Sequence, residues 1–458
     1  MTEIVEIPLW LFVLILLFAA VTALSHFLLP SVRWFFRRRF ERAVKRLNTK
    51  LSRPIEPFKL ARRYDMVQRL VYTPEVTQAI VDHAAENNVP ENVAFQKAKT
   101  YAREIVPSFS AFAYFSFAIR LARWLANSLY EVRTEESHDV RLADLPKDAT
   151  VIFIMNHRSN MDYVLAIYLA AHASTLSYAV GEWARVWPVS ALIKSVGAYF
   201  IRRRSRGPLY RKVLARYVKM ATDGGVTQAI FPEGGLTLDG KLRPPKLGLL
   251  TYVMGAYQPE GRDILFVPVA VNYDRVLEDR VLIAADKRGD RRFGGKVTVV
   301  FKFIMRKIWR AVSGRPLRFG TAAVSFGEPI SLRSYAQMPE PEQLAADLMA
   351  GVAELMPVLD MPLLCRAMLK LNGAMTKDQL ISGVEAEMRA CSAIKGPVEP
   401  TRAAQSVENA LTSISERNIL ENRGSEWVVK PKQEALLRFY SNSIDHFFRD
   451  EPPERGEL

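Results

Sequence analysis

A histidine followed five residues later by an aspartate is the pair in this chain best suited to acid–base chemistry. His157 and Asp162 come after the apolar, β-branched run 150–155, which predicts a buried strand. Helix positions five residues apart lie roughly 140° apart, so the two side chains can meet only on a turn. Asp162 would then accept a hydrogen bond from one ring nitrogen of His157 and leave the other free to take a proton. With this spacing alone, an ordinary strand-to-helix turn is the more common explanation.

Arginines cluster at the end of a second predicted strand. The stretch 197–204 is GAYFIRRR, and it places Arg202 and Arg203 directly after the apolar residues. Guanidinium groups grouped in this way can bind a phosphate through paired hydrogen bonds, and a phosphomonoester substrate would suit them. A solvated basic loop is the alternative for this stretch taken by itself.

A carboxylate and a proline mark two further strands. Glu233 and Gly234 belong to FPEGG at 231–235, directly after an apolar run, so the carboxylate would stand on a glycine-permitted turn at a strand tip. A glutamate in such a place often has only a structural role. Pro268 interrupts the apolar run 267–273, and a proline within a strand predicts a sheet edge or a bulge.

Composition narrows the class of protein. The chain has 458 residues, 49% of them hydrophobic, which excludes a mostly disordered protein and allows two or three domains. Its net charge of +15 indicates an anionic partner, which can be nucleic acid, a membrane surface or a phosphorylated substrate. The two cysteines, Cys365 and Cys391, have neither disulfide-framework nor zinc-site spacing, so a reducing compartment fits.

The N-terminal region carries a membrane signal. Residues 8–29 are apolar and free of Asp, Glu, Lys and Arg, which predicts a transmembrane helix. Glu3 and Glu6 precede the run, where a cleaved signal peptide would have a basic segment. An arginine-rich flank follows it, and the positive-inside rule then places the rest of the chain in the cytoplasm.

Two later stretches also concern the membrane. Basic and aromatic residues continue through 31–63, and beside a membrane span this composition favours contact with anionic lipid head groups over nucleic-acid binding. The apolar stretch 108–130 contains Arg120 and Arg123, which argue against a full span. It would be an amphipathic helix that lies on the bilayer or covers the active site, or else a buried core helix, and its role stays open.

The chain divides into four expected parts: an anchor at 1–30, a basic helical region at 31–149, a catalytic α/β domain at 150–335 and a helical C-terminal domain at 340–458. Predicted strands in the third part cover 151–155, 198–201, 226–231, 264–270, 296–303 and 323–326, and predicted helices cover 163–173, 210–222 and 248–255. In the fourth part, apolar residues recur at helical spacing over 344–359, 363–371, 377–388 and 403–420.

Taken in order, the blocks resemble the glycerolipid acyltransferase superfamily, whose pattern is H-x4-D, G-x-x-F-I-R-R, F-x-E-G-G and then V-P. The chain is most similar to its membrane-bound bacterial glycerol-3-phosphate 1-O-acyltransferases. The stretches NHRSNMDY, DGKLRPPKLGLL and FGEPISL each resemble a family stretch, and LLRFYSNSIDHFF at 436–448 is similar to the family's closing segment. The resemblance covers 151–332 firmly and the C-terminal domain loosely.

The resemblance implies a mixed sheet flanked by helices and an enzyme of phospholipid synthesis at the inner membrane. The reaction would be acyl transfer from acyl-CoA or acyl-ACP to the sn-1 hydroxyl of glycerol 3-phosphate, with His157 as base, Asp162 as its partner and no covalent acyl-enzyme. No metal or organic cofactor is expected. The substrate-binding candidates are Arg158, Arg202, Arg203, Glu233, Gly234, Thr237, Lys246 and Pro268.

The chain departs from the family pattern after Glu233. The family has E-G-G-R-S-R, whereas this chain keeps a hydroxyl at Thr237 but has Leu236 and Leu238 in place of both arginines. Either Arg202, Arg203 and Lys246 bind the phosphate unaided, or the acceptor differs. The alternatives are a lysophospholipid or dihydroxyacetone-phosphate acyltransferase and, in another class, a catalytically silent membrane scaffold.

Overall fold

The computed structural model describes residues 8–49, 51–136, 144–170, 175–181, 189–202, 207–289, 319–394 and 398–448. Arg203 and the strand predicted at 296–303 lie outside the described residues. The chain forms two compact units, Met1–Ile55 and Glu56–Leu458.

The first unit consists of one long helix, α1, which spans Leu9–Asn48 and follows Pro8. Its position agrees with the helix predicted from residue 8. In the part of the chain that the structure describes, no helix combines the length and the apolar character needed to cross a bilayer. The transmembrane span therefore stays a prediction.

The second unit is built on a mixed eight-stranded sheet in the order β1-β7-β6-β2-β5-β3-β4, with β8 paired to β6. Its strands are β1 (Glu131–Glu136), β2 (Thr150–Met155), β3 (Ser177–Val180), β4 (Tyr199–Phe200), β5 (Gln228–Ile230), β6 (Ile264–Tyr273), β7 (Thr321–Phe326) and β8 (Ile330–Ser331). β2 pairs in parallel with both β5 and β6, whereas β7 and β8 run antiparallel to β6. The mixed α/β sheet expected from the sequence is confirmed.

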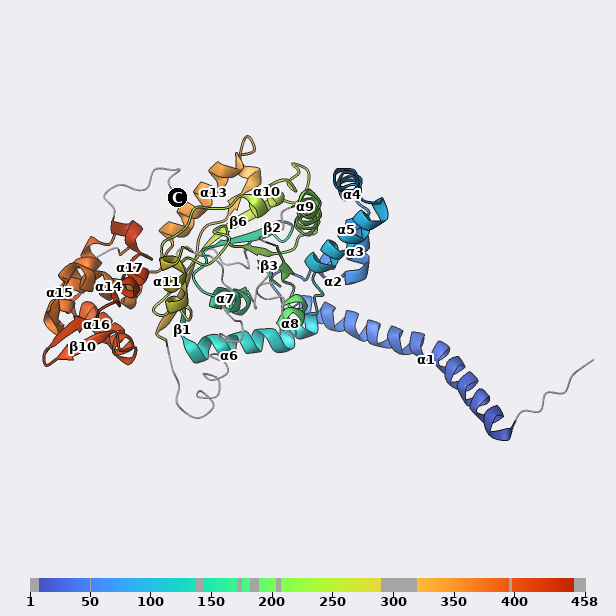
Figure 1. Cartoon of the computed structure of the whole chain (residues 1–458), viewed down its shortest axis with the longest axis horizontal. Coiled ribbons are helices and arrows are strands. Elements are labelled where there is room, and N and C mark those ends of the chain that lie inside the picture. The colour runs from blue at the N-terminus through green and yellow to red at the C-terminus, as the bar shows by residue number, and fades with distance from the viewer. Residues whose placement is uncertain are drawn as a thin grey trace, which may run out of the picture. The chain divides into compact units, whose positions relative to one another are not determined.

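Helices cover both faces of this sheet (Figure 1). On one side lie α6 (Ile119–Leu129) and α7 (Met161–Ala170), which contact each other; on the other lie α9 (Pro208–Asp223), α10 (Gly248–Met254) and α13 (Pro341–Glu354). The helices before the sheet are α2 (Pro57–Leu60), α3 (Arg63–Val71), α4 (Pro74–Asn87) and α5 (Glu91–Ile105). The short α8 (Val189–Ser195) and α11 (Asp279–Lys287) lie beside the sheet. Because both faces are covered, β2 and β6 are buried throughout.

The stretch 108–130, whose role the sequence left open, is a two-sided helix. A π-helical segment at Ala113–Ala118 leads into α6. Its small residues Ala118, Ala122 and Ala126 are buried, while Phe117 and Trp124 are exposed. The segment therefore packs on the rest of the second unit and presents an aromatic outer face.

Pro268 occupies an interior strand, so the expectation of a sheet edge or bulge is wrong. β6 lies between β2 and β7, and Pro268 pairs in register with Ile154 of β2. On its other side the neighbouring chain passes from β7 to β8, and the N–H of Gly327 donates to the Pro268 carbonyl. The missing N–H of proline is tolerated at this change of partner strand.

The C-terminal part contains a small sheet that the sequence did not predict. Its elements are α14 (Asp360–Leu371), β9 (Ala374–Thr376), α15 (Lys377–Ala390), α16 (Pro400–Glu416), β10 (Leu420–Arg423) and β11 (Glu426–Val429). The strands are antiparallel in the order β10-β11-β9, and the three helices contact one another. This chain order and strand order are those of a winged helix. The predicted helices are present, but strands of three or four residues are too short to show a period.

The helix after the winged helix packs against the loop that follows β5. This helix, α17, spans Glu434–Ser441, and Asn442 just beyond it donates to the Asp239 carbonyl at 2.8 Å. Gly240 has φ +92°, and a Cβ there would lie 1.9 Å from the Phe439 carbonyl oxygen. A close approach of two backbones therefore requires glycine at this position.

We expect Gly240→Ala to destabilise the protein by about 3 kcal/mol or more, because left-handed strain is added to a backbone clash. Gly289→Ala is the matched control, since Gly289 has φ +62° but no atom within 4 Å of the added Cβ. Its cost should be only about 1–2 kcal/mol. Thermal and denaturant unfolding of both variants measure the difference, and equal losses would contradict the packing described here.

Candidate active site

The carboxylate of Asp162 is the hydrogen-bonding centre of the turn after β2. Asp162 is fully buried, and its Oδ2 accepts from the Nδ1 of His157 and the N–H of Arg158, each at 2.8 Å, and from the N–H of Ser159 at 3.1 Å. Its Oδ1 accepts from the Tyr273 hydroxyl at 2.6 Å. Four donors satisfy this buried carboxyl group, and it fixes the geometry of the turn.

His157 is held in one orientation by this carboxylate and by aromatic rings. The ring of Phe231 lies 4.4 Å from the imidazole, centroid to centroid, and that of Tyr163 lies 5.3 Å away. Because Asp162 can only accept at Nδ1, we assign the ring proton to Nδ1. Nε2 is then an acceptor, and the Tyr163 hydroxyl lies 3.3 Å from it. The sequence-predicted contact between His157 and Asp162 is present.

Two more side chains fix the ends of the turn. Asn156 exchanges two hydrogen bonds with the backbone of Val271 in β6, at 2.8 and 2.9 Å, and so continues the sheet beyond β2. Glu278 accepts from the hydroxyl of Ser159 and from the backbone and side-chain amides of Asn160. Hydrogen bonds therefore fix the chain on both sides of His157, at Asn156 and at Ser159–Asn160.

Glu233 lies against the same turn. Its Oε1 accepts from the His157 backbone N–H at 2.8 Å, and the N–H of Thr237 donates to the His157 carbonyl at 3.0 Å. Its Oε2 is buried and has no hydrogen-bond partner among the described residues. Burial raises the pKa of this carboxyl to about 8, although the His157 N–H, Arg243 and Arg158 act in the opposite direction.

Cationic side chains gather around Glu233. Arg158 is buried; its Nη1 donates to the Gly240 carbonyl at 2.7 Å, while its Nε and Nη2 have no hydrogen-bond partner in the described part of the chain. Burial lowers the pKa of this guanidinium. Lys246 lies over Gly234, whose φ is +65°, so closely that a Cβ there would be 2.7 Å from the lysine Cδ. Of the predicted substrate-binding residues, the structure thus brings Arg158, Glu233, Gly234 and Lys246 together.

Thr237 and the two leucines that flank it hydrogen-bond or pack within the protein. The Thr237 hydroxyl donates to the Lys241 carbonyl at 2.7 Å and accepts from the Gly240 N–H, so it closes its own turn. Leu238 is buried and Leu236 packs against the core. Arg243 reaches this loop from further along the chain, since its Nη1 lies 3.5 Å from the Leu236 carbonyl oxygen.

Arg202 forms an ion pair with Glu104, at a distance from His157. Its Nε and Nη2 donate to both carboxylate oxygens of Glu104 in α5, at 2.6 to 3.1 Å, and Glu104 is buried. Two strands, β3 and β5, separate β4 from β2, which corresponds to about 14 Å across the sheet. The structure therefore does not group Arg202 with His157, and Arg203 lies outside the described residues. Pro268 packs on Gly351 of α13.

An apolar cavity begins beside Tyr163. It has a volume of about 230 Å³ and lies between α6, α7, β3 and α8. Tyr163 and Asn160 belong to its wall together with apolar side chains, among them Leu121, Leu125, Val164, Ile167 and Val180. The tyrosine that contacts Nε2 of His157 thus also borders a space suited to a hydrocarbon chain.

Sequence reasoning missed Tyr163, Tyr273 and Glu278 in this site. Tyr163 directly follows Asp162, which was a usable signal, and Tyr273 ends an apolar strand. Glu278 gave no signal. For metal binding, the described part of the chain contains no group of three or more His, Cys, Asp or Glu side chains placed to hold an ion.

We expect Arg202→Met to destabilise the protein by about 1–3 kcal/mol, because it leaves the buried Glu104 carboxylate without its partner. Adding Glu104→Leu should restore much of this loss. A double-mutant cycle on unfolding free energies measures the coupling. A single variant as stable as the parent would show that the ion pair contributes nothing and that Arg202 is available to a ligand.

The raised pKa of Glu233 predicts a pH-dependent stability. The folded state holds this proton up to about pH 8, whereas the unfolded chain releases it near 4.5, so ionisation opposes folding progressively between these values. Relative to the parent, Glu233→Gln should therefore become more stable as the pH rises from 5 to 8. Denaturant unfolding at several pH values tests this, and a stability difference independent of pH would exclude the raised pKa.

Two family models match the chain in succession. Residues 137–272 match the model described as Acyltransferase, and residues 306–451 match the model described as Glycerol-3-phosphate acyltransferase C-terminal region. The first contains His157, Asp162 and Glu233, and the second contains the whole winged helix and α17.

The curated relatives that match this chain are named glycerol-3-phosphate acyltransferase. The glycerol-3-phosphate acyltransferase of Pasteurella multocida is 27% identical over 85% of this chain and 51% of its own length. That of Pseudomonas putida strain KT2440 is 30% identical over 62% of this chain and 33% of its own. The chain thus aligns with about half or less of these relatives.

Among solved structures, the 1-acyl-sn-glycerophosphate acyltransferase of Thermotoga maritima matches 52% of this chain and 75% of its own, at 21% identity and a TM-score of 0.33. The two family models and the curated relatives together show that residues 137–272 and 306–451 are similar to glycerolipid acyltransferases.

Proposed function

We propose that this protein transfers an acyl group from an acyl thioester to a hydroxyl of glycerol 3-phosphate. The observation that carries the proposal is the His157–Asp162 pair, whose Nε2 faces a tyrosine on the wall of an apolar cavity. A base at the end of a hydrocarbon-sized space is what acyl transfer requires. The names of the curated relatives support the same reaction.

The chemistry follows from the protonation of the imidazole. With Nδ1 protonated, Nε2 takes the proton of the acceptor hydroxyl as its oxygen attacks the thioester carbonyl. The new C–O bond forms, the C–S bond breaks, and the proton on Nε2 passes to the leaving thiolate. Asp162 remains anionic and stabilises the imidazolium in between. Before this, the Tyr163 hydroxyl must give up its place at Nε2 to the acceptor.

No covalent acyl-enzyme is part of the proposal. Cys365 and Cys391 are both buried in the C-terminal part, and burial raises the pKa of each thiol. A thiol that resists ionisation is a poor nucleophile. Direct attack by the acceptor hydroxyl is therefore the simpler route.

Arg158 and Lys246 are the proposed ligands of the acceptor phosphate. Arg158 has two buried N–H groups without hydrogen-bond partners in the described chain, and Lys246 lies over the turn at Gly234. Both surround Glu233, which the family resemblance assigns to the acceptor site. Since Leu236 and Leu238 pack into the protein, they offer little apolar surface to a lysophospholipid, which favours glycerol 3-phosphate. Arg203 remains a further candidate.

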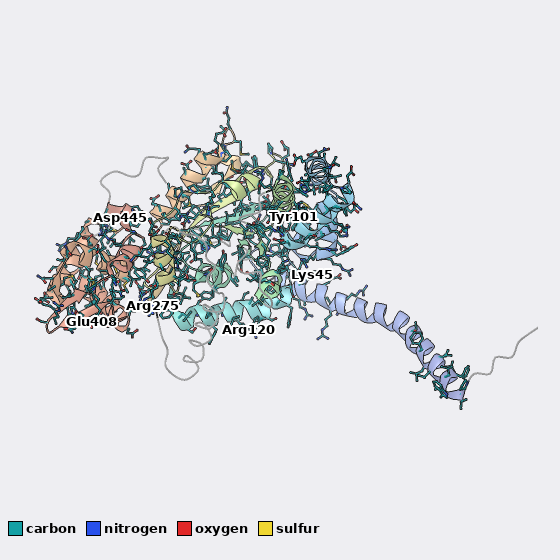
Figure 2. The ribbon with its side chains drawn as sticks, viewed as in Figure 1. Lys45, Tyr101, Arg120, Arg275, Glu408 and Asp445 are labelled. Atoms are coloured by element: carbon teal, nitrogen blue, oxygen red, sulfur yellow. The ribbon has the colours of Figure 1, made fainter. Side chains whose placement is uncertain are left out.

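We also propose that the sn-1 hydroxyl is acylated, from acyl-ACP or acyl-CoA, as the first step of phospholipid synthesis at the cytoplasmic face of the inner membrane. Charge and exposed apolar side chains support the location. In the π-helical segment, at the residue before it and on α6, the side chains of Phe117, Phe112 and Trp124 are exposed. Arg120 lies in the same stretch (Figure 2), and this composition suits an anionic lipid surface. The apolar run of α1 would provide a single-pass anchor.

His157→Ala should lower the turnover number by about 10²–10⁴-fold and leave the acceptor KM within a few-fold, because a general base acts on the barrier. Asp162→Asn should reduce turnover as well, since the amide cannot hold the same tautomer and charge. His83→Ala, at a half-buried histidine of α4, is the control and should keep parental activity. The rates are obtained by following product formation with purified full-length protein by mass spectrometry. A fully active His157→Ala variant would contradict the proposal.

Filling the cavity should change the acyl-chain preference. Val164→Trp or Val180→Trp places a large ring in the space, so turnover with long-chain thioesters should fall at least about tenfold more than turnover with short-chain ones. Val81→Trp, at an exposed position of α4, should alter neither. Rates with thioesters of two chain lengths provide the measurement, and an equal loss for both lengths would contradict acyl binding in this cavity.

A further inference from the structure

A second pocket lies where the catalytic sheet meets the winged helix. It has a volume of about 330 Å³ and is lined by the segment entering α11, by Phe319 just before β7 and by the end of α16. Three arginines from two of these segments converge on it: Arg275, Arg280 and Arg417. Figure 2 shows Arg275 at the side of the sheet that faces the C-terminal helices.

Arg417 forms a rigid wall of this pocket. It is buried, its Nη2 donates to Asp279, and its Nη1 donates to the Tyr440 hydroxyl at 3.2 Å. The same hydroxyl accepts from the Val276 N–H at 3.1 Å and donates to Asp279. This network joins the winged helix to α11 and α17, so the pocket is built into the fold.

Arg275 brings a positive charge to the pocket without a direct ion pair in the described part of the chain, although the Asp279 carboxylate acts on it from a distance. Its guanidinium carbon lies 4.3 Å from the centroid of the Phe319 ring, and among the described residues its side chain has neither a hydrogen bond nor an ion pair. Burial and the neighbouring Arg417 lower the pKa of this guanidinium. A cation in this situation gains energy when an anion enters beside it.

The acidic residues of the pocket are mostly satisfied by other groups. Glu278 receives three hydrogen bonds from Ser159 and Asn160, and Asp279 is held by Arg417, by Tyr440 and by the Arg280 N–H. Only Glu416, at an exposed position, has no such hydrogen bond or ion pair within the described part of the chain. Arg280 is held at the pocket by one hydrogen bond, from its Nη2 to the Arg417 carbonyl at 3.4 Å, so Arg275 and the other N–H groups of Arg280 are placed to meet a ligand.

We propose that this pocket binds a small anion carrying a phosphate or diphosphate group, held by Arg275 and Arg280 against the fixed guanidinium of Arg417. Guanidinium groups match phosphate oxygens in geometry and charge, and the volume admits a small phosphorylated molecule. This inference stands independently of the reaction proposed above.

The pocket is connected to the proposed catalytic turn through one side chain, that of Glu278. Glu278 forms part of the pocket wall and, through its carboxylate, holds Ser159 and Asn160 beside His157. The pocket is thus one side chain away from the turn. Its ligand is either a separate phosphorylated molecule or, in place of the assignment to Arg158 and Lys246 above, the phosphate of the acceptor, and the two share this chemistry.

The test measures pyrophosphate binding to the full-length chain by calorimetry at constant ionic strength. The parent protein and a His157→Ala variant should bind it equally, so that the result is separate from catalysis. Arg275→Met and Arg280→Met should each weaken binding by about 10- to 100-fold, as expected for a lost charge-assisted contact. Arg288→Met, at the exposed far end of α11, is the matched control and should leave the affinity unchanged.

Competition distinguishes the two sources. If glycerol 3-phosphate displaces pyrophosphate from the parent and this displacement needs Arg275, the pocket receives the acceptor; if it does not compete, the ligand is a separate molecule. The proposal is overturned if pyrophosphate fails to bind the folded parent, or if Arg275→Met, with an unchanged melting temperature, binds it as well as the parent does.

Discussion

The site depends on one buried carboxylate with four hydrogen-bond donors. A carboxylate out of water is costly unless its oxygens are paired, and Asp162 is paired with an imidazole, two backbone amides and a phenol. Three of these donors, from His157, Arg158 and Ser159, belong to the turn itself, and the fourth, Tyr273, comes from the distant end of β6. The orientation of His157 therefore depends both on the local H-x4-D turn and on a contact that only the folded sheet provides.

The strand order of the sheet brings the distant partners to the turn. β2 lies between β5 and β6, so the turn after β2 meets the loop with Glu233 on one side and the end of β6 with Tyr273 on the other. The carboxyl ends of neighbouring parallel strands share one edge, which is where α/β folds place their sites. Arg202 follows β4, which two strands separate from β2, and there its ion pair with Glu104 joins β4 to α5.

The sequence was a good guide where a residue acts through its neighbours in the chain. His157 and Asp162 are close in sequence, and the strand before them has an unmistakable apolar pattern. It was a poor guide where partners come from afar: the Glu104 that engages Arg202 precedes it by 98 residues, and Tyr273 follows Asp162 by 111. The winged-helix strands were missed because they are short. Pro268 was assigned to an edge because the sequence does not show that β6 changes its antiparallel partner strand beside this residue.

The protonation of the His157 ring is the most direct test of the account. Nitrogen NMR of the full-length chain labelled at its histidines, with His157 assigned by its loss in His157→Ala, reports which ring nitrogen carries the proton. Near neutral pH and without substrate, we expect protonated Nδ1 and an unprotonated Nε2, and we expect Asp162→Asn to disturb this state. A neutral ring protonated at Nε2 in the parent would contradict the role of Asp162 and, with it, the proposed base.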